Sequence, residues 1–480
     1  MKWFKNNYSN ILSVLYIAFI IILYISIIIG ILINHTYKNI AILALATISI
    51  VIIAFLLMKK KFKLNIKKFF YGIVLVLALI YISLLFLPYN APFVDYETFY
   101  YSASQFAINA EYNFKYIALF PHLWGYIMFL GTIFKIFGIS YSVVVASNII
   151  LTFITAYFIF KIIKRISTTN KGYLGAILWL INPINIIWCM FAFGGTAFNA
   201  FFAISIYITI LFFKTSNKKQ KILYSALLGI TLGIANLFRP VIIIFIIAIL
   251  IEIIYNYFIK KSNYKLCIFA SVLIMILCFT LLGKLSNIYL EKETGYVPAN
   301  SIGFTLYSGS DLKSNGSWSE EGSKILTEEM QKEPFDASRI QEKLQKLAIE
   351  NYKNNGIKNV NLMARKLITL TSNLGGYSWS NAIEMINMKI PSLVYNLLLS
   401  ITLFSYYFLI LMNGLFGFKY FKEKDNNLIL NILILFLIGF TLASLLLEVS
   451  SRYYLPALVP FTILGTIGLI NNKNYNIKSN

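Results

Sequence analysis

The residues best suited to chemistry stand in one short segment, Pro88-Tyr-Asn-Ala-Pro-Phe-Val-Asp95-Tyr-Glu97-Thr-Phe-Tyr-Tyr. Asp95 and Glu97 are carboxylates, which can accept a proton from a hydroxyl group. On a helix, residues two apart point roughly 200° apart, so both acids could face one substrate only in an extended loop. Asp95, which Tyr96 follows, is the better catalytic candidate. The alternative is a helix-capping or solvated acid.

Arginine is scarce in this chain, and Arg239 and Arg452 occupy similar settings. Arg239 precedes a proline between two apolar runs, and Arg452 lies in Ser-Arg-Tyr-Tyr-Leu-Pro. A guanidinium can bind phosphate through two parallel hydrogen bonds. The alternatives are contact with lipid headgroups or, for Arg452, an ion pair with Glu448 four residues earlier. Arg365 is a further candidate for substrate binding.

Other polar side chains could bind a substrate near these groups, namely Glu97, Tyr96, His122 and Asn199. His122 could contact a phosphate or a sugar hydroxyl, or could be structural. Asn199 could hydrogen-bond a sugar, or satisfy backbone groups near a helix break. The chain has no Cys/His cluster with zinc spacing, so we assign no metal ligands. A divalent-metal requirement stays open.

The chain that carries these residues has the composition of a membrane protein. It has 480 residues, of which 59% are hydrophobic, with a mean hydropathy of +0.73. Runs of about 20 apolar residues can each span a bilayer as a helix. We predict an all-α polytopic protein of about 12 spans, at 11–33, 40–58, 69–88, 141–160, 172–191, 196–213, 222–238, 240–259, 265–283, 391–413, 428–447 and 452–470.

The charges between these runs give an orientation. With both termini in the cytoplasm, the inner segments hold 24 Lys/Arg and three acids, and the outer segments hold 18 Lys/Arg and 16 acids. Basic residues concentrate on the cytoplasmic side of membrane proteins. The net charge of +23 is therefore mostly a topology signal, and we expect no nucleic-acid partner.

This orientation requires that the apolar stretch 120–138 does not cross the bilayer, because a crossing would turn every later basic loop outward. It contains Lys135, and Trp124 stands near its start, as is typical of interfacial helices. We predict a helix along the outer surface. Residues 89–140 then form one outer loop built from two juxtamembrane helices.

The other outer segment is polar and predicts a small mixed extracytoplasmic cap over residues 284–390. One helix there should be capped by Asp336 and end before Gly356. We divide the chain into 1–68, an N-terminal hairpin with a basic loop; 69–283, a catalytic membrane core; 284–390, the cap; and 391–480, the last membrane helices.

The order of these parts is similar to the GT-C superfamily of polytopic glycosyltransferases. An acidic Asp95-Tyr-Glu-Thr-Phe-Tyr-Tyr-Ser-Ala loop is followed by Pro-His-Leu-Trp-Gly-Tyr, Asn-Pro-Ile-Asn-Ile-Ile-Trp, an outer Arg-Pro and a late Ser-Arg-Tyr-Tyr-Leu-Pro. Within the superfamily, residues 69–470 look most like the protein O-mannosyltransferases and the lipid A aminoarabinose transferase. The resemblance implies a polyprenyl-phosphate sugar donor. It also implies that Asp95 is the carboxylate that serves in catalysis, that Arg239 and Arg452 hold the phosphate, and that His122 lies in the catalytic region.

The chain departs from that pattern in two places. The family usually begins at the span before the acidic loop, so residues 11–58 would be an added helical hairpin. Many members carry a second acid where this chain has Gly-Gly-Thr-Ala-Phe-Asn199. That difference puts a two-acid mechanism, or carboxylate metal binding at this point, in doubt.

From these observations we expect an inverting glycosyltransferase of a bacterial plasma membrane with its active site facing outside. Its acceptor would be an extracytoplasmic cell-wall polymer, lipid or protein. Two alternatives stay open: a transporter or flippase of a lipid-linked or polar solute, and a polymerase of lipid-linked repeat units. Product analysis separates them into single-sugar addition, movement without a new bond, and chain growth.

Overall fold

The computed structural model describes residues 2–34, 36–58, 66–111, 114–259, 265–423 and 427–469. Its apolar bundle is built from twelve helices: α1 (Lys2–Ile33), α2 (Tyr37–Met58), α3 (Lys67–Ser83), α7 (Tyr141–Ile166), α8 (Thr169–Ile181), α10 (Gly195–Lys214), α11 (Lys218–Phe238), α12 (Ile242–Ile253), α13 (Lys265–Thr294), α19 (Ser392–Glu423), α20 (Leu428–Ser444) and α21 (Leu458–Gly468). A π-helical segment, η3 (Ile254–Ile259), continues α12.

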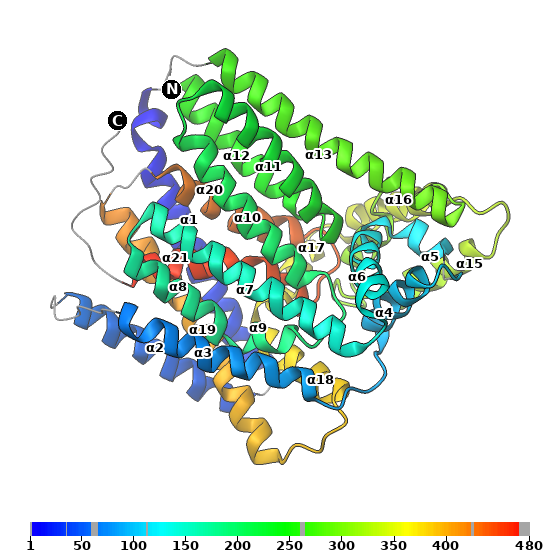
Figure 1. Cartoon of the computed structure of the whole chain (residues 1–480), viewed down its shortest axis with the longest axis horizontal. Helices are drawn as coiled ribbons and strands as arrows, with labels where there is room; N and C mark the ends of the chain where they lie inside the picture. Colours follow the sequence, from blue (N-terminus) through cyan, green and yellow to red (C-terminus); the bar gives the residue numbers. More distant parts are fainter. Residues whose placement is uncertain are drawn as a thin grey trace.

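The remaining elements are shorter. They are η1 (Leu84–Phe86), α4 (Val94–Ala107), α5 (Phe114–Leu119), η2 (Pro121–Leu123), α6 (Trp124–Phe137), α9 (Pro183–Trp188), α14 (Gly303–Ser310), α15 (Glu320–Met330), α16 (Ala337–Asn355), α17 (Lys358–Ser372), α18 (Leu374–Met385) and η4 (Ser451–Ala457). Helices α4, α5, α6, α15 and α16 gather at one end of the bundle, on the right of Figure 1.

The prediction of an all-α membrane protein is confirmed by the presence of helices that are long and apolar enough to span a bilayer. Among the described residues, eight helices meet that criterion, and the segments Ile242–Asn256 and Leu428–Ser444 are shorter apolar helices. Each of the 12 predicted spans contains a helix, but those in 172–191 and 452–470 are only 13 and 11 residues long. Prolines at positions 183 and 456 follow or precede these helices and limit their length.

The mixed cap predicted for residues 284–390 is wrong, because the described part of this segment is helical. The described chain contains no strand, and its single β-bridge joins Tyr89 to Ile386. The predicted helix is confirmed: the Asp336 side chain accepts a hydrogen bond from the Arg339 N–H at 3.0 Å, and Gly356 follows the helix end with φ of 51°. A helix that packs on one partner helix needs only a short apolar stripe to cover its buried face. Helix α14 packs on α16 in this way.

The cap is fixed to the outer loop by its own small core. Phe304, Ile340 and Leu344 of the cap cluster with Leu119 and Phe120, at the junction of α5 and η2. Gln341 joins the two parts: its amide donates to the Leu119 carbonyl at 3.0 Å and accepts from the Phe304 N–H at 2.7 Å. The cap therefore packs directly on the segment that carries His122.

Helix α1 packs on the rest of the bundle along one face and is joined to it by polar contacts. Tyr16 donates a hydrogen bond to Asn413 of α19 at 2.8 Å, and Tyr8 donates to Glu252 of α12 at 2.5 Å. Near its other end, Ser26 hydrogen-bonds Thr371 of α17. These buried polar contacts join α1 to three helices that are distant in sequence.

Candidate functional site

Asp95 lies in the first turn of α4, at a strained point of the backbone. Val94, immediately before it, has φ of 50°, a left-handed conformation that is unfavourable for a β-branched residue. The start of a helix favours a negative charge, and the Asp95 Oδ2 atom forms an ion pair with Nη2 of Arg452. Its side chain is 36% exposed. Asp95 is thus held by a cation and remains accessible to solvent.

Arg452 enters the site from η4, and only its two terminal nitrogens, Nη1 and Nη2, have partners in the described chain. Besides the Asp95 ion pair, its Nη1 atom donates to the Tyr377 hydroxyl at 3.2 Å. Its Nε atom is buried and has no hydrogen-bond partner in the described part of the chain. The Glu448 carboxylate instead accepts a hydrogen bond from Tyr453 at 2.8 Å, and burial raises the pKa of Glu448. The alternative pairing of Arg452 with Glu448 is therefore not formed.

Arg239 enters from the end of α11. Its backbone N–H donates a hydrogen bond to the Ala235 carbonyl at 3.0 Å, at the C-terminal end of that helix. Helix α6 crosses α11 at very close range here. Only glycine fits at position 125 of α6, because any side chain there would collide with the Leu237 carbonyl oxygen of α11. Arg239 is 9% exposed, and its Nη2 atom is buried without a partner among the described residues. Burial lowers the pKa of Arg239 to about 10, so the guanidinium stays charged at neutral pH.

One aromatic ring, Phe193, brings the two arginines together. The guanidinium carbons of Arg239 and Arg452 lie 4.7 Å and 5.8 Å from its centre, within the range of a cation–π contact. The loop that carries Phe193 is held by Asn148, whose amide donates to the Cys189 and Phe191 carbonyls at 3.1 Å and 2.8 Å. Two like charges gathered on one ring, each with an unused buried N–H, form an arrangement suited to an anion.

His122 lies in η2, with its side chain exposed. Its ring packs edge-on against Phe120, with centres 6.2 Å apart. The protein packed around it and the charge of Arg239 lower the pKa of His122, while Asp95 opposes that shift. His122 is therefore neutral at neutral pH and lies within electrostatic range of both Arg239 and Asp95.

Of the other predicted residues, Glu97 and Arg365 lie away from the two arginines, whereas the Tyr96 ring packs edge-on against Phe193, with centres 6.2 Å apart. Glu97 is exposed and lines a groove along α4, and its side chain makes no contact with the two arginines among the interactions of the described chain. Tyr96 is buried, and its ring stacks on Phe191 at 4.6 Å. Arg365 is exposed in the cap and donates to the Asn315 side chain at 3.0 Å.

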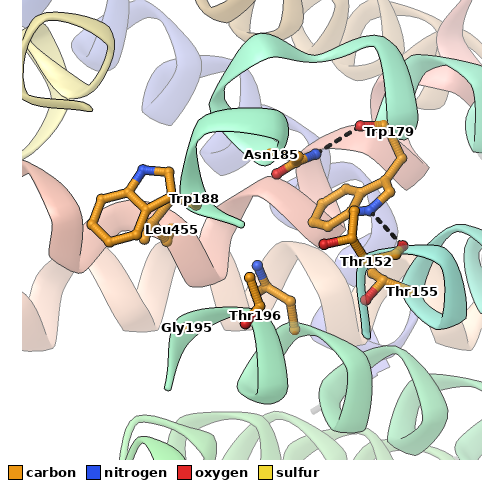
Figure 2. A pocket seen from close by; sticks show the side chains of 9 residues that line it. Thr152, Thr155, Trp179, Asn185, Trp188, Gly195, Thr196 and Leu455 are labelled. Atoms are coloured by element: carbon orange, nitrogen blue, oxygen red, sulfur yellow. Dashed lines mark hydrogen bonds between the residues drawn. The ribbon is translucent and has the colours of Figure 1, made fainter. Parts of the chain in front are cut away.

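Asn199 lines a small polar cavity whose volume is about 10 Å³, room for about one water molecule. Figure 2 shows threonines 152, 155 and 196 around this cavity, with Asn185 donating to the Trp179 carbonyl at 2.8 Å. The Asn199 Oδ1 atom is buried and has no partner in the described structure. A neutral, water-sized site therefore occupies the place where the resemblance implies a second acid.

Sequence reasoning missed the residues that support the arginines, chiefly Phe193, Tyr377 and Tyr453. Tyr453 directly follows Arg452, and Tyr377 follows a Gly-Gly pair after a helix, so sequence position gave weak signals for both. Phe193 lies among many aromatic residues and gave none. Among the described residues, no three His, Cys, Asp or Glu side chains are grouped as a metal site would require.

Comparisons with known proteins bear on residues 121–283. This segment matches the family described as dolichyl-phosphate-mannose-protein mannosyltransferase (PMT_2). The matched segment contains His122, Asn199 and Arg239, whereas Asp95 and Arg452 lie outside it. Neither the curated proteins nor the solved structures give a match. Over residues 121–283, about a third of its length, the chain is thus similar to the PMT_2 family, a GT-C family of membrane glycosyltransferases that use a sugar donor carried on a lipid phosphate.

Proposed function

We propose that the chain transfers one sugar from a polyprenyl-phosphate donor to a hydroxyl group of an extracytoplasmic acceptor, with inversion at the anomeric carbon. The acceptor oxygen attacks the anomeric carbon as the bond to the phosphate oxygen breaks. Asp95 takes the acceptor proton, and polyprenyl phosphate leaves with one additional negative charge. The acceptor would be a cell-wall polymer, a lipid or a protein at a bacterial plasma membrane.

The observation that carries this proposal is the pair of arginines on Phe193, next to an accessible Asp95. Arg239 Nη2 and Arg452 Nε are buried donors without partners in the described chain. An unpaired buried donor is costly, and a phosphate oxygen at each would remove that cost. Donors aimed at the leaving phosphate stabilise charge as it develops, which lowers the barrier.

Asp95 and Arg452 form an ion pair, so their two roles must be reconciled. While Arg452 Nη2 holds Oδ2 of Asp95, only the other carboxylate oxygen is left to take a proton. We propose that the donor phosphate draws the Arg452 guanidinium toward itself and frees Asp95 for the acceptor. Donor binding would then precede productive acceptor binding.

The test is transfer of sugar from a polyprenyl-phosphate sugar by the purified chain with Asp95→Asn. Loss of a general base typically lowers turnover by about 10²- to 10⁴-fold, and donor binding should remain measurable. Thermal unfolding in detergent checks that the variant is folded, because the substitution also weakens the Arg452 contact. Near-normal turnover in a folded Asp95→Asn protein would remove Asp95 from the reaction.

A further inference from the structure

A second polar site lies beside the catalytic candidates, on the outer loop. It is a solvent-open groove of about 380 Å³, within the size range of ligand pockets, roughly 300–1,000 Å³. One wall is a single face of α4, carrying Glu97, Thr98, Tyr101 and Ser102, and the other wall includes Glu111 and Tyr116.

The groove adjoins Asp95. Thr98 and Ser102 stand three and seven residues after Asp95 on α4, and side chains at that spacing share a helix face. On the opposite wall, Tyr116 lies within electrostatic range of Asp95 and Glu448. A molecule in the groove could therefore extend one hydroxyl group to the Asp95 carboxylate.

The chemistry of the lining is distinctive. It offers two carboxylates, hydroxyl groups and two tyrosine rings, and no lysine or arginine is among its lining residues. The nearby Lys115 is held by Glu333 at 2.6 Å, so it does not neutralise Glu97 or Glu111. Carboxylates accept hydrogen bonds from sugar hydroxyls, tyrosine rings pack against the apolar faces of sugar rings, and two uncompensated acids repel an anion.

We infer that this groove binds the acceptor, and that the acceptor is a glycan that is neutral or carries amino groups rather than an anionic polymer. Among the described residues, the lining contains no aliphatic side chain that would favour the side chains of a peptide. The role as acceptor site rests on the proposed function, whereas the preference for neutral or amino-bearing glycans rests on the groove alone.

Binding to the detergent-solubilised full chain tests the preference directly. Three probes of equal length are used: tetramers of glucosamine, N-acetylglucosamine and galacturonate. We expect binding of the glucosamine and N-acetylglucosamine tetramers and at least about tenfold weaker binding of the galacturonate tetramer. The double variant Glu97→Gln and Glu111→Gln should abolish the difference between the glucosamine and galacturonate tetramers. Glu350→Gln, which removes an exposed acid of α16, should change nothing. Equal binding of all three tetramers, or a preference that survives the double variant, would overturn the inference.

A second measurement separates the groove from the transfer reaction. Slow hydrolysis of the donor, with water as acceptor, requires Asp95 and the arginines but not the groove. We expect the apparent KM of the Gln double variant for the bound tetramer to rise roughly tenfold, whereas Glu350→Gln, outside the groove, should hydrolyse the donor at the wild-type rate and keep the wild-type KM. If hydrolysis is absent in the wild type but the binding preference remains, the proposed function fails and the groove stands. A double variant whose KM for the tetramer is unchanged would refute the groove.

Discussion

Replacing Arg239 by lysine tests whether this arginine grips a phosphate or anchors the chain at the lipid surface. Lysine keeps the positive charge and can still reach the headgroups, but it loses the planar fork that forms two parallel hydrogen bonds. Arg239 is only 9% exposed and packs at 4.7 Å on Phe193, which already favours an internal role. An anchor should tolerate the change.

The structure sets the expected size of the effect. The Nη2 atom of Arg239 is the donor left without a partner in the described chain, and a lysine cannot present it together with a second parallel N–H. A hydrogen bond that involves a charged group is worth about 1.5–3 kcal/mol. If one such bond forms only in the transition state, kcat/KM should fall about 10- to 150-fold, and most of the fall should be in kcat.

The assay is sugar transfer at donor concentrations below and above saturation, with Arg365→Lys as the matched control. Arg365 is exposed and bonds only Asn315 among the interactions of the described chain, so its replacement should leave the rate unchanged. Arg452→Lys should also lower turnover, and the double variant should lose less than the product of the two effects, because both residues act on one phosphate. A wild-type rate in Arg239→Lys with the donor below saturation would refute the reasoning.

Two further predictions concern topology and pH. In a variant without native cysteines, a cysteine at Ser140 should label from outside, whereas one at Ser167, at the other end of α7, should label only after permeabilisation; labelling of position 140 only from inside would reverse the orientation. Burial lowers the pKa of Lys366 in α17 to about 7, against the attraction of Glu448. The unfolded chain therefore binds more protons between about pH 7 and 10.5, and thermal stability should rise with pH across that window. Lys366→Met should flatten this rise, measured by thermal unfolding, while Lys358→Met, at an exposed position of the same helix, should leave it intact.

Much of the fold could be predicted because hydropathy and helix signals are local. Apolar runs marked where the membrane helices lie, and Asp336 and Gly356 marked the two ends of α16. The cap was mispredicted because a polar segment with short apolar stripes does not reveal whether its turns join helices or strands. The polar contacts of α1 were not predicted either, since those with Glu252 and Asn413 join residues hundreds of positions apart.

The site was predictable where a charge stands out against an apolar background. Asp95, Arg239 and Arg452 were candidates because charges at the ends of spans are few, and the structure places Asp95 against Arg452 and both arginines on Phe193. Phe193 could not be found in the same way, because the chain has 40 phenylalanines. The local helical geometry of Asp95 and Glu97 did give the correct result that they face different surroundings.

The polar contacts of α1 have a consequence for how the protein is made. Helix α1 leaves the ribosome long before α19, so Tyr16 must wait for Asn413, which lies 397 residues later in the chain. At about 5–20 residues per second, that interval is roughly 20–80 s. During this time Tyr8, Tyr16 and Ser26 lack their final hydrogen-bond partners within a hydrophobic segment. Membrane insertion of α1 and its docking are therefore separate events.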